Sequence, residues 1–148
     1  MARSEVFAIE QVKGIEVEVP FLNIRGDYII LNPIKISTHS EILTSELSDN
    51  NDYIFESLED SFLCEKLKAA TQKLAQYLGI TTYGRVDFRI KSDRSFFVFD
   101  VATMPYTTKH SSFNYNFEQY ELTLTDVHKL VYNALVYCIS VSISPLRK

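Results

Sequence analysis

The sequence has no long hydrophobic run, little cysteine and no excess of positive charge. No apolar stretch in its 148 residues approaches the roughly 18 residues that a membrane-spanning helix needs. The N-terminus also lacks the hydrophobic region of a signal peptide, so we expect a cytoplasmic protein without a membrane segment. The net charge of −4, from 15 basic and 19 acidic residues, argues against binding to nucleic acid, whose phosphate backbone attracts basic surfaces.

The two cysteines, Cys64 and Cys138, fall in predicted helices and lack the spacing of a metal site. We expect them to be reduced, partly buried thiols, as is usual in the cytoplasm. The sequence shows no internal repeat or low-complexity segment. With 46% hydrophobic residues, residues 1–148 are expected to form a single domain with its own core.

The most informative stretch runs from residue 83 to residue 112 and predicts a β-hairpin followed by a polar loop. Apolar and charged residues alternate from Arg85 to Ile90, which is typical of a strand with one buried face. Residues 96–101 form a second apolar run, interrupted only by Asp100. The polar segment 91–95 between the two runs has the composition of a tight turn.

A turn at Asp93 and Arg94 would fix the register of this hairpin, because every opposed pair then follows by counting. The pattern separates apolar from charged side chains, and a slip of one residue would mix them. The predicted apolar pairs are Val86 with Val101, Phe88 with Phe99, and Ile90 with Phe97. The predicted pairs on the other face are Arg85 with Ala102, Asp87 with Asp100, and Arg89 with Val98.

This register places the carboxylates of Asp87 and Asp100 directly opposite one another, with Cβ atoms roughly 4.5–5.5 Å apart. Such a pair destabilises a sheet by up to about 1 kcal/mol unless a cation offsets it. Arg85 and Arg89, which flank Asp87 on its own strand, could do so. A bound Mg²⁺ could do so too. A plain solvated cluster of Asp and Arg is the alternative, because structural ion-pair networks are common.

The remaining segments predict an α+β fold, a mainly antiparallel sheet of β-hairpins with two long helices packed on it. Residues 5–11 and 15–21 predict a hairpin around Lys13-Gly14, and residues 28–36 a further strand. In the strand 15–21, Val17, Val19 and Phe21 form one face, and Glu16 and Glu18 form the other. Residues 38–52 and 104–119 are predicted to be polar loops, the first with a short helical turn. The predicted helix 57–78 begins at Ser57, and Gly79 follows its last residue. Its apolar stripe consists of Leu63, Leu67, Ala70, Leu74 and Tyr77. The helix 123–141 begins at Thr123 and Asp126, with a stripe of Val127, Leu130, Val131, Ala134, Leu135 and Cys138.

The order of four short motifs resembles the C-terminal half of an ATP-grasp ligase of the D-alanine–D-alanine ligase group. The motifs are IEQVKGIE near the N-terminus, GRVDF in the first strand of the hairpin, DVATMP at the end of the second strand, and TKHSS in the loop that follows. That resemblance covers most of the chain. It implies the fold of the ATP-grasp C-terminal subdomain, with ATP and Mg²⁺ as cofactors.

The resemblance also implies roles for particular residues. ATP would phosphorylate a carboxylate, and an amine would then displace the phosphate to give an amide. Arg85 would stabilise the transferring phosphate or the tetrahedral state, and Ser111 would bind the carboxylate of a substrate, with Lys109 and His110 nearby. The nucleotide contacts would be Glu10, Gln11, Val12 and Glu16, and the metal ligands Asp87 and Asp100.

Three positions depart from the family pattern. Asp100 replaces a metal-binding Glu, Ala102 replaces a metal-binding Asn, and Tyr106 replaces a Gly that follows the proline. The chain also begins at the junction that the family places after its N-terminal subdomains, which clamp the nucleotide from the other side.

The sequence therefore leaves two functions open. The first is the C-terminal catalytic portion of an ATP-dependent carboxylate–amine ligase that is inactive alone. It would be either a fragment of a longer protein or a chain that assembles with a separate N-terminal ATP-grasp half. The second is a non-catalytic ATP-grasp relic that forms homo-oligomers or binds a partner. Its surface would be apolar where the missing subdomain once packed, with Tyr28, Ile30, Phe96 and Val98 as its expected members.

Overall fold

A computed structural model describes residues 10–39 and 43–143 and contains a six-stranded antiparallel sheet with four helices. The strand order is β4-β3-β1-β5-β6, and β2 pairs with the far end of β1. The strands are β1 (Ile15–Ile24), β2 (Asp27–Ile30), β3 (Ile34–Ser37), β4 (Ile54–Ser57), β5 (Tyr83–Ile90) and β6 (Phe96–Ala102). The helices are α1 (Ser45–Asp49), α2 (Ser61–Tyr77), α3 (Ser112–Glu118) and α4 (Leu124–Ile143). The predicted α+β class, with two long helices on an antiparallel sheet, is confirmed.

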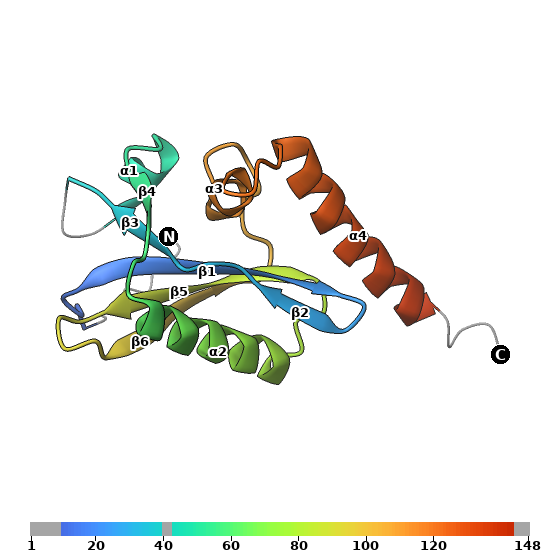
Figure 1. The fold of residues 1–148 in the computed structure, drawn as a ribbon, viewed down its shortest axis with the longest axis horizontal. Helices are drawn as coiled ribbons and strands as arrows, with labels where there is room; N and C mark the ends of the chain where they lie inside the picture. The colour runs from blue at the N-terminus through green and yellow to red at the C-terminus, as the bar shows by residue number, and fades with distance from the viewer. Residues whose placement is uncertain (1–9, 40–42, 144–148) are drawn as a thin grey trace, which may run out of the picture.

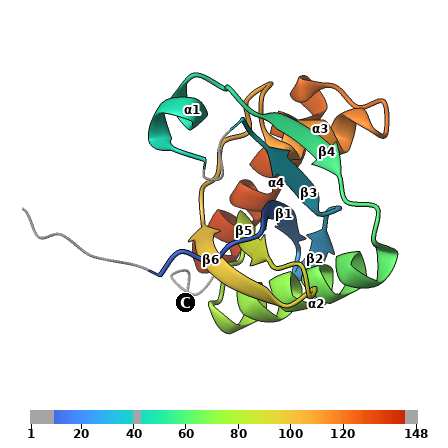
Figure 2. The same cartoon turned by 90° about the vertical axis from the view of Figure 1, so that its left-hand side faces the viewer.

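The helices cover the two faces of the sheet separately (Figure 1). Helix α2 lies against one face, and α3 and α4 lie against the other; the view in Figure 2 shows the same layers from the side. Each face has its own core. The α2 core is formed around Val17, Val19, Phe21, Leu67, Val86 and Phe88, and the core under α3 and α4 around Leu22, Tyr83, Phe113, Phe117, Val127 and Val131.

The alternation in β1 is as predicted, but its pairing is not. Val17, Val19 and Phe21 are fully buried under α2, and the side chains of Glu16 and Glu18 face the other way. The predicted partner strand, 5–11, lies largely outside the described residues, and residues 10–12 form no strand. Instead β1 is the centre of the sheet and pairs with β2, β3 and β5.

The predicted register of the β5–β6 hairpin is correct for its first half only. Arg85 pairs with Ala102, Val86 with Val101 and Asp87 with Asp100, as expected. A β-bulge between Asp87 and Phe88 then shifts the pairing by one residue, because an extra residue of β6 is left without a partner there. The pairs predicted beyond it are wrong; the observed pairs are Phe88 with Val98, Arg89 with Phe97, and Ile90 with Phe96.

The bulge exchanges which aromatic side chains are buried. Phe96, rather than Phe97, packs on the α2 core and against Phe88. Phe97 and Phe99 are 46% and 52% exposed, and each lies beneath a cation, the Lys91 ammonium and the Arg89 guanidinium respectively. The expected apolar surface is therefore wrong in part. Tyr28, Ile30 and Phe96 are partly buried on the α2 core, and of the four expected members only Val98 is exposed.

Helix α2 begins at Ser61, four residues later than predicted. Asp60 is its N-cap and accepts a hydrogen bond from the Leu63 backbone N–H, whereas Ser57 ends strand β4, which the sequence reading missed. The stripe is buried at Leu63, Leu67, Thr71 and Ala75, a strict spacing of four, so the predicted member Tyr77 is wrong and is 86% exposed. Gly79 follows the helix in the left-handed conformation, as expected.

The C-terminal part of the chain contains one predicted and one unpredicted helix. Thr123 and Asp126 exchange hydrogen bonds at the start of α4, which confirms that helix and its cap. The predicted loop 104–119 instead contains α3. Cys64 and Cys138 are both partly buried, as expected. In the part of the chain that the structure describes, no helix is long and apolar enough to cross a bilayer.

Candidate functional site

A polar cavity of about 330 Å³ lies on the α3 side of the sheet, over the middle of β1 and β5. Its floor is built from the charged side chains of these two strands, among them Glu18, Arg85 and Asp87. Its walls come from α1, from the segment around Tyr53, and from the loop that carries His110. Four segments far apart in the sequence, around residues 16–18, 43–55, 85–87 and 106–111, thus meet at one site.

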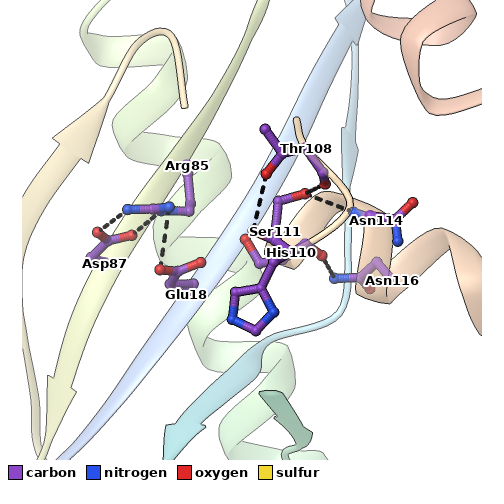
Figure 3. A network of polar contacts seen from close by, with 9 residues as sticks. Glu18, Arg85, Asp87, Thr108, His110, Ser111, Asn114 and Asn116 are labelled. Carbon is purple, nitrogen blue, oxygen red and sulfur yellow. Dashed lines mark hydrogen bonds and ion pairs between the residues drawn. The ribbon is translucent and has the colours of Figure 1, made fainter. Parts of the chain in front are cut away.

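The floor is organised by a single guanidinium (Figure 3). Arg85 Nε and Nη2 donate to the two carboxylate oxygens of Asp87, each at 2.7 Å. Arg85 Nη1 lies 3.2 Å from Glu18 Oε1 on the neighbouring strand. Glu18 stands opposite Asp87 in the β1–β5 pairing, and Asp100 stands opposite Asp87 in the β5–β6 pairing. The three acids therefore form a row across three strands, with Arg85 beside it.

Burial controls the charges in this row. It would lower the pKa of Arg85, but hydrogen bonds to Asp87 and the charge of Glu18 raise that pKa above its ordinary value, so Arg85 remains a cation. Burial raises the pKa of Asp87, although the hydrogen bonds from Arg85 act in the opposite direction. The pKa of Glu18 is raised to about 7, mainly by burial. The charges of Asp87 and Glu16 also raise it, whereas the charge of Arg85 and a hydrogen bond from Ser112 lower it.

We expect Glu18 to make the protein less stable as the pH rises. A carboxyl whose folded pKa lies above its unfolded pKa binds protons more tightly in the folded state, so its stabilising contribution is complete below about pH 4.5 and is lost as the pH rises through about 7. The free energy of unfolding of the wild type should therefore fall relative to that of Glu18→Gln by about 1–3 kcal/mol between these limits.

Urea unfolding of both proteins at several pH values measures this difference. Glu65→Gln removes an exposed acid of α2 and is the matched control; its difference from the wild type should not change over the same pH range. A difference between wild type and Glu18→Gln that stays constant with pH would contradict the assignment.

A second buried ion pair extends the polar face. Arg89 Nη2 donates to Glu16 Oε2 at 3.0 Å, and burial raises the pKa of Glu16 while Arg89 lowers it. Glu16, a predicted nucleotide contact, lines the cavity. The other predicted nucleotide contacts, Glu10, Gln11 and Val12, precede β1 and are not among the residues that line it.

The residues present do not fit a Mg²⁺ ion in this arrangement. Asp87 and Asp100 are opposed, as predicted, but both oxygens of Asp87 are bonded to Arg85, and Asp100 is exposed outside the cavity lining. Ala102, opposite Arg85, has no ligand atom. Across residues 10–39 and 43–143, no group of three or more His, Cys, Asp or Glu side chains is placed to hold a metal ion.

Ser111 is at the cavity wall, but its hydroxyl is already used. It donates to the Thr108 carbonyl at 2.7 Å and accepts from the Asn114 backbone N–H at 3.2 Å, as the N-cap of α3. Asn116 holds the same helix in place, because its side-chain amide bonds both backbone groups of Asn32. The structure thus brings Ser111 to the cavity that Arg85 and Asp87 form, in a role that the sequence did not indicate.

The sequence assigned no site role to Glu18 or Tyr53, and it placed His110 only as a neighbour of the carboxylate that Ser111 would bind. Glu18 was assigned only to a face of β1, and its pairing with Asp87 joins strands that are distant in the sequence. His110 packs against the rings of Tyr53 and Phe55, at centroid distances of 4.6 and 5.0 Å. The one available signal for His110 was its position next to Ser111 in the TKHSS motif.

Comparisons with known proteins show the family and the fold. A family model described as "D-ala D-ala ligase C-terminus" matches residues 1–132. Solved structures with similar folds include D-alanine–D-alanine ligase from Bacillus anthracis complexed with ATP (TM-score 0.65, 21% identity, 86% of this chain and 40% of that one). D-alanyl-alanine synthetase A from Vibrio cholerae (0.64, 19%, 85% and 40%) and the VanG D-Ala:D-Ser ligase from Enterococcus faecalis (0.62, 18%, 84% and 37%) are also similar.

No curated protein matches the sequence. The chain spans about 40% of the length of the solved ligases that it resembles.

Proposed function

The chain belongs to the D-ala D-ala ligase C-terminus family, and we propose that it is the C-terminal catalytic portion of an ATP-dependent carboxylate–amine ligase. Such a ligase uses ATP to phosphorylate a carboxylate, and an amine displaces the phosphate to form an amide. The proposal includes a cytoplasmic location and an N-terminal ATP-grasp half, within the same protein or in a partner chain, which supplies the rest of the nucleotide site.

The observation that carries this proposal is the position of Arg85. Its guanidinium is held rigidly by Asp87 and Glu18 at the floor of the cavity, and three of its N–H groups point at their carboxylates. A guanidinium has five N–H donors, so the remaining part of its fork can stabilise negative charge that develops on a phosphate or carbonyl oxygen. We derive no role for a metal ion, because the carboxylates present do not fit one.

We expect that the 148-residue chain alone neither hydrolyses ATP nor transfers its phosphate. One side of the nucleotide would be open to water, and phosphoryl transfer depends on positioning from both sides. For the same reason, and because Asp87 is bonded to Arg85, its affinity for Mg·ADP should be weaker than micromolar. Phosphate release and calorimetry measure the two properties.

The control for the turnover assay is Asp87→Ala. ATP turnover above background that Asp87→Ala abolishes would contradict the expectation, whereas turnover that persists in the variant identifies a contaminating enzyme. The family role itself is tested by NMR titration with millimolar Mg·ADP. Amide shifts should concentrate at residues 10–16 and 85–87, and shifts confined to the α2 face would contradict the proposal.

A non-catalytic relic is the second candidate, and the exposed edge of the sheet favours it. Strand β6 is at the end of the strand order, and Phe97, Val98 and Phe99 are all about half exposed on it. An apolar edge strand can pair with another chain. This candidate is preferred if Mg·ADP shifts no resonance on the cavity face while the chain self-associates in solution.

A further inference from the structure

The cavity beside Arg85 carries more negative charge than its own cation can neutralise. Four acidic side chains line it, and Arg85 is the one lysine or arginine among the lining residues; the acids are Glu16, Glu18, Asp49 and Asp87. Arg89 pairs with Glu16 from outside the cavity. Arg85 is divided between Glu18 and Asp87, so this buried group of three keeps one uncompensated negative charge when both acids are ionised.

The unbalanced charge is on Glu18. The residue is only 5% exposed, and its Oε1 faces Arg85. Its other oxygen, Oε2, is fully buried and has no partner of good hydrogen-bond geometry among the described residues. Besides Arg85, the Ser112 hydroxyl is the side-chain donor near this carboxylate, and its effect on the pKa of Glu18 is smaller than that of burial. An ionised carboxylate left this way is strongly unfavourable. It requires either a proton or a positively charged ligand.

The walls of the cavity suit an organic cation better than a metal ion. Tyr53, Phe55 and His110 form a packed aromatic cluster at the cavity, and aromatic faces attract ammonium groups. His110 Nε2 is also buried without a hydrogen-bond partner among the described residues.

The cavity also offers little to a carboxylate. The Ser111 hydroxyl donates to the Thr108 carbonyl. Three of the five Arg85 N–H groups are directed at Asp87 and Glu18, and the two that remain stand beside the uncompensated charge of these acids. A ligand with its own carboxylate would add a further negative charge beside Glu18 and Asp87. We propose that this cavity binds a small organic ammonium that carries no carboxylate, with Glu18 as its counter-ion.

The role of this ligand in the reaction rests on the proposed function, in which it would be the amine that attacks the activated carboxylate. The binding itself needs no ATP and no other domain. It can therefore be tested on the 148-residue chain, and its failure leaves the ligase proposal untouched.

The test is an NMR titration of the isotope-labelled chain with 1,4-diaminobutane, D-alanine and Mg²⁺, each alone. The diamine should shift the resonances of Glu18, Tyr53 and His110 and bind about tenfold more tightly than D-alanine, which corresponds to about 1.4 kcal/mol. Glu18→Gln should weaken diamine binding by about tenfold or more. The control Glu65→Gln, which removes an exposed acid of α2, should leave it unchanged.

The affinity should also rise between about pH 5.5 and pH 8, because a bound cation favours the ionised form of Glu18. Burial raises the pKa of that group to about 7. The other titratable groups that face it or line the cavity are Glu16, Asp49, Tyr53, Arg85, Asp87, Tyr106 and His110. The part of the pH dependence that Glu18→Gln removes is therefore the part due to Glu18.

Three results would overturn the inference. They are D-alanine binding as tightly as the diamine, Glu18→Gln binding the diamine like the wild type, and Mg²⁺ alone producing the Glu18-dependent shifts. If Glu18→Gln does not fold, Asp49→Asn and Tyr53→Leu replace it, since Asp49 is exposed and Tyr53 is only partly buried. Each should weaken diamine binding several-fold, and unchanged binding in both variants contradicts the inference.

Discussion

Replacing Arg85 with methionine is expected to lower the free energy of unfolding by about 3–5 kcal/mol near neutral pH, because it leaves two buried carboxylates without their cation. Asp87 and Glu18 are both nearly inaccessible to solvent, and Arg85 is the partner of each. Methionine keeps much of the side-chain volume, so the loss reports charge rather than packing. Urea unfolding measures it.

The matched control is Arg94→Ala. Arg94 forms an ion pair with Asp60 at 3.1 Å, but its side chain is 70% exposed, so its loss should cost less than about 1 kcal/mol. Adding Asp87→Asn and Glu18→Gln to Arg85→Met should recover part of the lost stability, because the two buried carboxylates that Arg85 neutralised are then absent. Equal effects for Arg85→Met and Arg94→Ala would show that the floor of the cavity is solvated and not built as described.

Replacing Phe88 with alanine is expected to cost about 3–5 kcal/mol, the usual range for a fully buried phenylalanine. Phe88 is completely inaccessible to solvent and packs edge-to-face on Phe96 within the α2 core. Phe99→Ala is the control, and it should cost less than about 1 kcal/mol because Phe99 is half exposed. Both are measured by urea or thermal unfolding.

This pair of variants also tests the β-bulge. Without the bulge, Phe99 would stand opposite Phe88 on the core face, and its loss would destabilise the protein about as much as that of Phe88. With the bulge, Phe99 lies on the charged face, with its ring beneath the Arg89 guanidinium. A large loss of stability in Phe99→Ala would therefore indicate that the hairpin has the straight register that the sequence predicted, without a bulge.

The sequence predicts one half of this hairpin and not the other, for a physical reason. From Arg85 to Ile90 apolar and charged residues alternate, so the buried face of β5 is unambiguous. The partner run FFVF has apolar residues at every position. Either register then places an apolar side chain on the core, and the choice depends on packing against α2, which Phe96 makes.

At the site, the sequence predicts the local pairing of two strands and not the long-range one. The pairing of Asp87 with Asp100 follows from a local turn, and counting along the chain was enough to predict it. The pairing of Glu18 with Asp87 joins β1 to β5, which are neighbours in the sheet but far apart in the sequence. Helix α3 was missed because its buried side chains include Ser112, Asn114 and Asn116, which form hydrogen bonds that no apolar pattern reveals.

On the floor of the cavity, the Arg85 guanidinium is shared by the carboxylates of Glu18 and Asp87. Carbon-13 NMR titration of the side-chain carboxyl groups tests this directly, because each acid is observed separately. We predict that Glu18 titrates near pH 7, that Asp87 and Glu16 titrate above their ordinary values, and that all three shift when Arg85 is replaced. Ordinary titration of Glu18 near pH 4.5, unaffected by Arg85→Met, would contradict the account.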